Sequence, residues 1–166
     1  IVLAFLGWGA YLGLSVRRTP GVLREWGLST VGLRRDARLP GLVLAVGAAA
    51  LAAVGAVRGT LLVHWHMLPL LALYPIWGLL QQFMVQAMIA RNLDALLGRR
   101  WLVVVTAAAL FGIVHWPDRF LMISTCVLGL LFTPIYLRRR SLLPLGLVHG
   151  WLGVLAYYWL LGRDPW

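Results

Sequence analysis

The sequence predicts an all-α, polytopic membrane protein: a transmembrane bundle of about six helices. The chain has 166 residues, of which 61% are hydrophobic and only 12% are charged, and its mean hydropathy is +0.85. Soluble domains are usually about 45–50% apolar. Apolar runs close to the roughly 20 residues that a bilayer-spanning helix needs recur along the chain. We therefore expect one transmembrane domain over residues 1–166.

Six apolar segments are the predicted spans: residues 1–16, 41–57, 69–91, 101–116, 119–137 and 141–161. The first is short, and Ile1 has neither a Met nor a basic segment before it, so we expect a fragment or a processed chain rather than a signal peptide. Pro40 suits the start of the second helix, where its missing N–H costs nothing. Trp116-Pro117-Asp118 is a typical helix end after the fourth span.

The arginines are distributed unevenly between the predicted loops. Residues 17–39, 91–100 and 138–140 carry twelve of the fifteen basic residues, all of which are arginine. Cytoplasmic loops of membrane proteins are enriched in Arg and Lys. We therefore expect these three loops on the cytoplasmic side of a bacterial-type cytoplasmic membrane, and both chain ends outside. Topology accounts for the net charge of +10, so we expect no nucleic-acid partner.

Within residues 17–39, arginines alternate with Trp26 and several leucines. Such a pattern is typical of a segment that lies in the headgroup layer. We expect a cytoplasmic, interfacial, amphipathic loop that contacts anionic lipid headgroups.

The third predicted span carries three glutamines, Gln81, Gln82 and Gln86, in its second half. Lipid cannot satisfy the hydrogen-bonding groups of a primary amide. Gln82 and Gln86 are four residues apart and should lie on one helix face, with Gln81 about 100° around the helix. This face should point into the bundle, and the expected partners are His115 and His149 in later spans.

No carboxylate lies inside an apolar segment. The acidic residues are Glu25, Asp36, Asp94, Asp118 and Asp164. This excludes a membrane-embedded carboxylate pair, the usual basis of general acid–base catalysis. His115 and His149 are then either functional residues or packing histidines bonded to the glutamines.

Three smaller candidates remain open. His64 and His66 flank Trp65, either as a two-ligand metal site or as an interfacial turn. Cys126 could face His115 as a nucleophile beside a base, or pack as an inert thiol. Asp118 could contact His115 or cap the following helix.

The order and spacing of the polar residues resemble the CPBP family, which contains CAAX prenyl proteases and bacteriocin-processing proteins and is also called the Abi family. Its members carry Glu-Glu-x-x-x-Arg, Phe-x-x-x-His and His-x-x-x-Asn on successive membrane helices. Gln81 and Gln82 stand at the two glutamates, and Gln86 stands at the arginine.

The second and third motifs match more closely. Phe111 and His115 fit Phe-x-x-x-His, and His149 fits the last histidine, with Gly153 at the asparagine. The resemblance implies an intramembrane endopeptidase fold in which the glutamate activates a water and the histidines polarise it or bind the oxyanion. An amide has no useful basicity near neutral pH, so the glutamines depart from that chemistry.

We therefore expect a CPBP-family intramembrane endopeptidase-like protein that is atypical or catalytically degenerate. The alternative is a non-catalytic accessory or scaffold subunit of a larger membrane complex. The residues at the motif positions are His115, His149, Gln81, Gln82 and Gln86. Two histidines with neutral amides are a poor metal-ligand set, because catalytic zinc usually has three His, Cys or carboxylate ligands. The sequence contains no cofactor motif, and the expected partner is a membrane protein or a membrane-proximal peptide.

Overall fold

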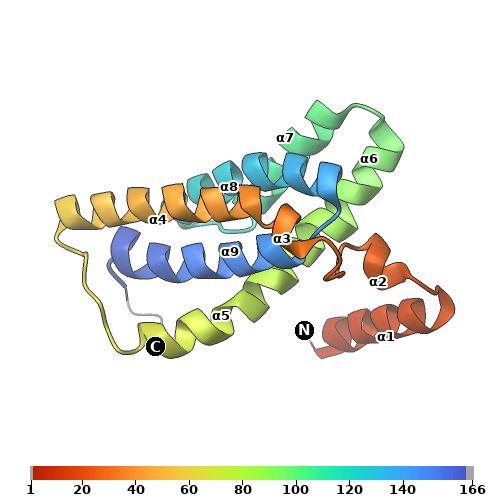
Figure 1. Cartoon of the computed structure of the whole chain (residues 1–166), viewed down its shortest axis with the longest axis horizontal. Coiled ribbons are helices and arrows are strands. Elements are labelled where there is room, and N and C mark those ends of the chain that lie inside the picture. Colours follow the sequence, from red (N-terminus) through yellow and green to blue (C-terminus); the bar gives the residue numbers. More distant parts are fainter. Residues whose placement is uncertain (1, 164–166) are drawn as a thin grey trace.

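The computed structural model describes residues 2–163, so Ile1 and Asp164 lie outside the described residues. The described elements are α1 (Val2–Arg18), α2 (Val22–Glu25), α3 (Leu33–Asp36), α4 (Arg38–Arg58), α5 (Met67–Gln82), the π-helical η1 (Phe83–Ala90), α6 (Arg91–Leu97), α7 (Arg100–Ile113), α8 (Arg119–Arg139), α9 (Leu143–Leu155) and the π-helical η2 (Ala156–Leu160). Every described element is helical, so the all-α prediction is confirmed (Figure 1).

Four helical stretches are long and apolar enough to cross a membrane: Leu33–Arg58, Met67–Leu97, Arg119–Arg139 and Leu143–Leu160. The apolar helix α7 is shorter, with 14 residues. A helix occupies most of each of the six predicted spans, and the chain is an integral membrane protein. The helix of the fourth predicted span, α7, ends at Ile113, three residues before the predicted end at Trp116. His115 therefore lies in the turn that follows α7.

The bundle is built around the contact between α5 and α9, which approach backbone to backbone at three glycines. A Cβ on Gly78 would lie 2.5 Å from the carbonyl oxygen of Gly146, and one on Gly150 would lie 2.5 Å from Cα of Pro75. Gly146 and Gly150 form a Gly-x-x-x-Gly pattern, which lets membrane helices pack closely. This close packing fixes the register between the glutamine helix and the His149 helix.

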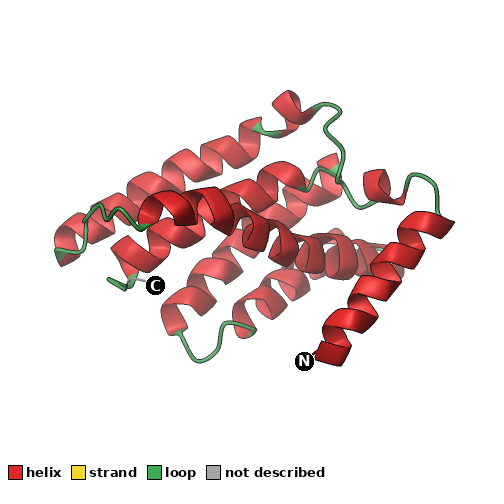
Figure 2. Ribbon diagram, turned by 90° about the horizontal axis from the view of Figure 1, so that it is seen from below, coloured by secondary structure: helices red, strands yellow, loops and turns green. Residues whose placement is uncertain are grey.

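Two further contacts complete the bundle. α4 packs on α9, where a Cβ on Gly47 would lie 2.9 Å from Leu152. α7 packs on α8, where a Cβ on Gly129 would lie 2.7 Å from Cα of Ala108. Small residues therefore set the helix spacing at each main contact. Figure 2 shows α1 leaving the bundle at an angle, with its N-terminal end away from the other helices.

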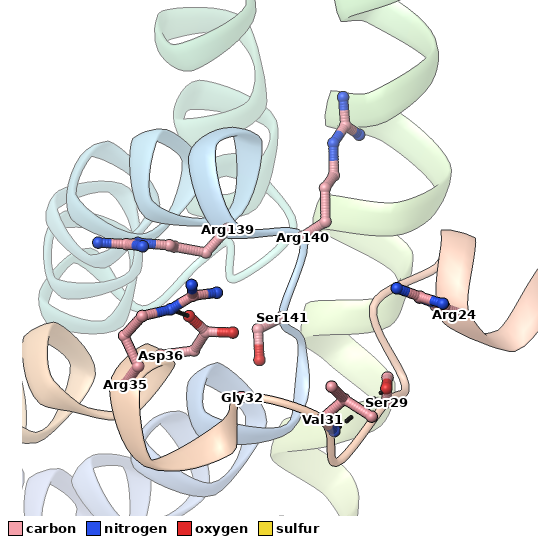
Figure 3. Close-up of a pocket in the computed structure, with 9 residues that line it drawn as sticks. All are labelled: Arg24, Ser29, Val31, Gly32, Arg35, Asp36, Arg139, Arg140 and Ser141. Carbon is pink, nitrogen blue, oxygen red and sulfur yellow. Dashed lines mark hydrogen bonds and ion pairs between the residues drawn. The ribbon is translucent and has the colours of Figure 1, made fainter.

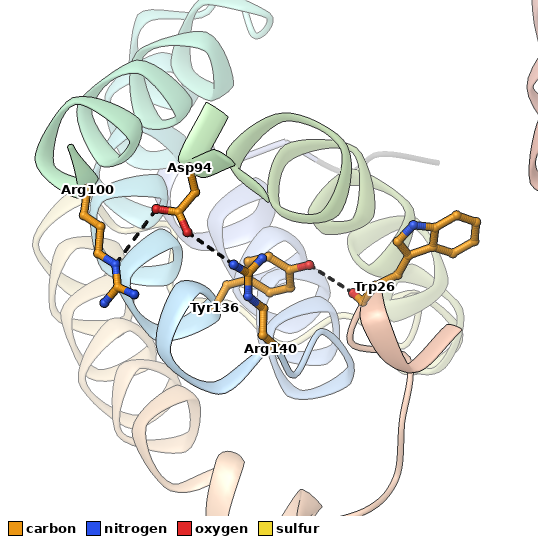
Figure 4. Close-up of polar contacts among 5 residues, drawn as sticks. All are labelled: Trp26, Asp94, Arg100, Tyr136 and Arg140. Atoms are coloured by element: carbon orange, nitrogen blue, oxygen red, sulfur yellow. Dashed lines mark hydrogen bonds and ion pairs between the residues drawn. The ribbon is translucent and has the colours of Figure 1, made fainter. Parts of the chain in front are cut away.

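The three arginine-rich loops lie together at one end of the bundle (Figure 1). The backbone N–H of Leu142 donates to the carbonyl of Gly27 at 2.8 Å, and Gly27 adopts φ 88° where a Cβ would meet the carbonyl oxygen of Arg140. Figure 4 shows Tyr136 donating to the carbonyl of Trp26, at 3.2 Å. The loop of residues 17–39 is thus fastened to the α8–α9 connection.

Candidate functional site

A buried network of three polar side chains joins α5 to α9. Nε2 of Gln82 lies 3.2 Å from Nδ1 of His149, and Nε2 of Gln86 donates to Oε1 of Gln82 at 3.1 Å. Gln82 and Gln86 have no exposed surface, and His149 is 6% exposed. The structure therefore brings Gln82, Gln86 and His149 together inside the bundle. The helix spacing had predicted that the two glutamines share a face.

Gln86 lies in η1, where the helix widens from α to π geometry directly after Gln82. Single π-helical turns inside α-helices occur frequently at functional sites. Oε1 of Gln86 is buried and has no hydrogen-bond partner among the described residues. An amide oxygen in this state retains an unmet capacity to accept a hydrogen bond.

Gln81 has a different environment from its neighbour. It is partly exposed and lines a large cavity, together with His115 and His149. Two adjacent residues therefore differ in environment: Gln82 belongs to the buried network, and Gln81 lies on the cavity wall. This agrees with the predicted rotation of about 100° between them. Of the two positions that match the family's glutamates, Gln81 is the one exposed to the cavity.

His115 does not join the glutamine network. Among the described residues no hydrogen bond links it to a glutamine; its Nδ1 lies 2.8 Å from the carbonyl oxygen of Phe111 and 3.3 Å from the hydroxyl of Thr125. The expectation that both histidines bind the glutamines is therefore wrong for His115. The reason is the early end of α7, which lets His115 turn back onto its own helix end.

Phe111 lies between the two histidines. Its ring contacts His115 edge-to-face with centroids 5.4 Å apart, and His149 in the same way at 5.3 Å. The ring is 1% exposed and therefore rigidly packed. Edge-to-face contacts of this kind orient aromatic rings. Phe111 holds both imidazoles on the wall of one cavity.

The cavity is an open groove with a volume of about 1130 Å³, lined by α4, α5, η1 and α9 together with α7 and α8. Some of its wall residues are more than half exposed, Val46 and Ile123 among them. Its wall is mostly apolar, and its polar side chains include Gln81, His115 and His149 together with four hydroxyl-bearing residues, Tyr74, Ser124, Thr125 and Tyr157. Gly153, at the position of the family's asparagine, also lines it. Within residues 2–163, no carboxylate lines the cavity. A pocket with this composition suits an apolar ligand that carries a few polar groups.

The remaining candidates from the sequence make structural contacts. His64 stacks on Tyr158 with ring centroids 5.6 Å apart. Asp118 caps α8 by accepting from two backbone N–H groups, so the capping interpretation holds. Thr125, and not its neighbour Cys126, bonds to His115. No group of three His, Cys, Asp or Glu side chains in the described part of the chain is placed to hold a metal.

Thr125 is the site residue that the sequence did not reveal. Its hydroxyl also donates to the carbonyl of Leu121 at 2.7 Å, which is the ordinary bond of a threonine in a membrane helix. The signal available for Thr125 was its polar side chain, which stands in an apolar span opposite His115.

A comparison with protein families now adds to this geometry. The family model "Type II CAAX prenyl endopeptidase Rce1-like" matches residues 42–155. The chain belongs to this family. The match includes every residue of the network, both histidines and the glycine contacts between α5 and α9, and it confirms the CPBP resemblance. No curated protein and no solved structure matches the chain.

Proposed function

We propose that this member of the Rce1-like family binds a membrane-proximal peptide segment in the cavity beside His115 and His149 but does not hydrolyse it by the family's glutamate-dependent route. The observation that supports this proposal is the cavity wall itself. It is large and mostly apolar, it presents Gln81 and two histidines, and it contains no carboxylate from the part of the chain that the structure describes.

The binding half of the proposal depends on the size and chemistry of the cavity. About 1130 Å³ exceeds the upper end of the usual range for small-ligand pockets, roughly 300–1,000 Å³. An extended peptide with an apolar attachment would bury its side chains there, while Gln81 and the imidazoles meet its backbone polar groups. Unmet peptide groups are costly in an apolar setting, so these few polar residues matter.

The catalytic half depends on basicity. General base catalysis needs a group whose pKa is near the operating pH, and a primary amide offers none. Gln82 is moreover engaged by both Gln86 and His149, which holds its amide away from the cavity. A protein of this kind would recognise a substrate segment and retain it, as a pseudoenzyme of the family.

The test uses the full chain reconstituted in lipid nanodiscs and a fluorescent peptide ending in a prenylated Cys-a-a-X sequence. We expect saturable binding, and mass spectrometry should recover the peptide intact. Leu131→Trp, which introduces a bulky ring on the cavity wall, should weaken binding by roughly tenfold, or about 1.4 kcal/mol. Leu130→Trp is the matched control, because Leu130 is on the same helix, is similarly exposed (42% against 46%) and does not line the cavity.

Two results would overturn the proposal. Cleavage of the peptide by the wild-type chain, abolished by His149→Ala, would establish a working protease. Absence of saturable binding, or equal weakening by the two tryptophan variants, would remove the cavity as the binding site.

A second candidate is an accessory subunit that binds a membrane-protein partner. The observation in its favour is α1, which packs against α2 and leaves the bundle, with Leu14 and Val16 exposed (Figure 2). Purification in mild detergent distinguishes the two functions. A stoichiometric partner that stays bound in the His115→Ala/His149→Ala variant supports the subunit, and its loss in that variant supports the cavity.

A further inference from the structure

A second cavity, of about 370 Å³, lies at the arginine-rich end of the bundle, and neither His115 nor His149 lines it. It is formed where α2 and α3 meet the connection from α8 to α9. Figure 3 shows Arg35 and Arg139 on one side of it, Arg24 on the other, and Ser141 between them. The cavity brings three segments of the chain together around a small volume.

The charges around this cavity are not balanced. Asp36 is the carboxylate on its wall, and it is paired with Nε of Arg35 at 3.1 Å. Arg24 and Arg139 have no carboxylate partner among the described residues, and both are exposed enough to reorient over the opening. Two uncompensated guanidinium groups therefore remain at the rim. Arginine is the side chain best suited to bind phosphate, because its fork of donors matches two phosphate oxygens.

Arg140 lines the cavity but does not supply its guanidinium. That group points away, toward Asp94, with Nη2 at 3.2 Å from Oδ2 (Figures 3 and 4). Arg140 thus serves to position the connection, leaving Arg24 and Arg139 as the cations available to a ligand.

Ser141 gives the independent indication of a ligand. The residue is 6% exposed, its Oγ is buried, and this oxygen has no hydrogen-bond partner among the described residues. A buried hydroxyl without a partner is unfavourable, and native proteins usually satisfy such groups. Ser141 lies in the middle of the α8–α9 connection, residues 140–142, at the wall of the basic cavity, so a bound anion would supply the missing acceptor.

We propose that this cavity binds a phosphate group, held by Arg24 and Arg139 with a hydrogen bond donated by Ser141. The end of a membrane helix bundle that gathers the arginines is where anionic headgroups concentrate. The same chemistry would recognise the phosphomonoester of a lipid or free inorganic phosphate. The proposal is independent of the proposed peptide-binding function, because the two cavities share no lining residue.

The experiment measures the unfolding temperature and binding affinity of the full chain in neutral detergent. The probes are short-chain phosphatidic acid, short-chain phosphatidylglycerol and inorganic phosphate, with chloride at equal ionic strength as the reference. We expect phosphatidic acid to bind more tightly than phosphatidylglycerol. Its phosphate is a monoester, so it has one more unesterified oxygen than the diester of phosphatidylglycerol. A response to both phosphatidic acid and inorganic phosphate identifies free phosphate as sufficient, and a response confined to phosphatidic acid identifies a lipid headgroup.

Two double variants separate the cavity from the general positive charge. Arg24→Gln/Arg139→Gln removes the two rim cations, and Arg34→Gln/Arg138→Gln removes two neighbouring exposed arginines that do not line the cavity. Both lose the same charge. The first should raise the Kd by roughly tenfold or more, and the second by about twofold or less.

Ser141→Ala removes the third group without changing charge. Because its hydroxyl has no partner in the described structure, the variant should fold as stably as the wild type without ligand while binding phosphate more weakly. Equal loss of affinity in both double variants would overturn the proposal, as would equal affinity for phosphatidic acid and phosphatidylglycerol.

Discussion

Gln82 and His149 are 67 residues apart in sequence, yet their side chains lie 3.2 Å apart, between Nε2 of the amide and Nδ1 of the ring. The contact exists because Gly78, one turn before Gln82, lies against Gly146 and Gly150, which flank the His149 turn of α9. Close packing at these glycines therefore places the polar pair of Gln82 and His149 in the bundle interior. The hydrogen bond and the helix contact support each other.

Replacing Gln82 by Leu should destabilise the bundle. The change leaves His149 and Gln86 without their shared partner, and such bonds in membrane proteins are worth roughly 0.6–2 kcal/mol each. Gln81→Leu is the matched control, because Gln81 lines the cavity and is no part of the network. Reversible unfolding in bicelles measures both. Equal destabilisation would show that the network contributes nothing specific.

Carboxylates should be tolerated differently at the same two positions. Gln82→Glu places a carboxyl group at a site with no exposed surface. Its ionised form costs several kcal/mol there, unless the group stays protonated. Gln81→Glu places it on the cavity wall, where the side chain is partly exposed. We expect folded yield to fall sharply for Gln82→Glu and little for Gln81→Glu, measured by size-exclusion chromatography. The reverse order would contradict the assigned positions.

The fold and half of the site follow from simple patterns in the sequence. Hydropathy predicts the helices of the six apolar segments, because a bilayer imposes length and apolarity on any span, but it does not predict the short helices α2 and α3. The i, i+4 spacing predicts the Gln82–Gln86 pair, because helix geometry alone places them together. The contacts of His115 could not be predicted, since they depend on where α7 ends and on which residue of α8 faces it. Local spacing does not contain that tertiary information.

Gly150→Ala should disrupt the contact that positions the site. The added Cβ would lie 2.5 Å from Cα of Pro75, so the helices must separate along their backbones. Overpacking of this kind typically costs about 1–3 kcal/mol. Gly41→Ala, where a Cβ meets nothing within 4 Å, should be neutral or stabilise by about 0.5–1 kcal/mol. Unfolding in bicelles compares them, and a harmless Gly150→Ala would refute the close contact.

Asp94→Asn should loosen the arginine-rich end. Asp94 accepts from Arg140 at 3.2 Å and lies 3.9 Å from Nε of Arg100 (Figure 4). Its side chain is 18% exposed, and Nη1 of Arg140 is buried without a partner among the described residues, so no second acceptor replaces it. We expect a loss of about 1 kcal/mol, at the upper end of the roughly 0.2–1 kcal/mol that exposed ion pairs contribute.

The matched control for Asp94→Asn is Glu25→Gln, which removes the ion pair between Glu25 and Arg91 at the same end. Glu25 is 52% exposed in its pair with Arg91, so water and salt screen it and the loss should be about 0.5 kcal/mol or less. Because Arg140 also carries the carbonyl against which Gly27 packs, only Asp94→Asn should speed amide hydrogen exchange around Gly27 and Leu142. Faster exchange there in both variants, or in neither, would show that the Asp94–Arg140 ion pair does not hold the loop of residues 17–39 in place.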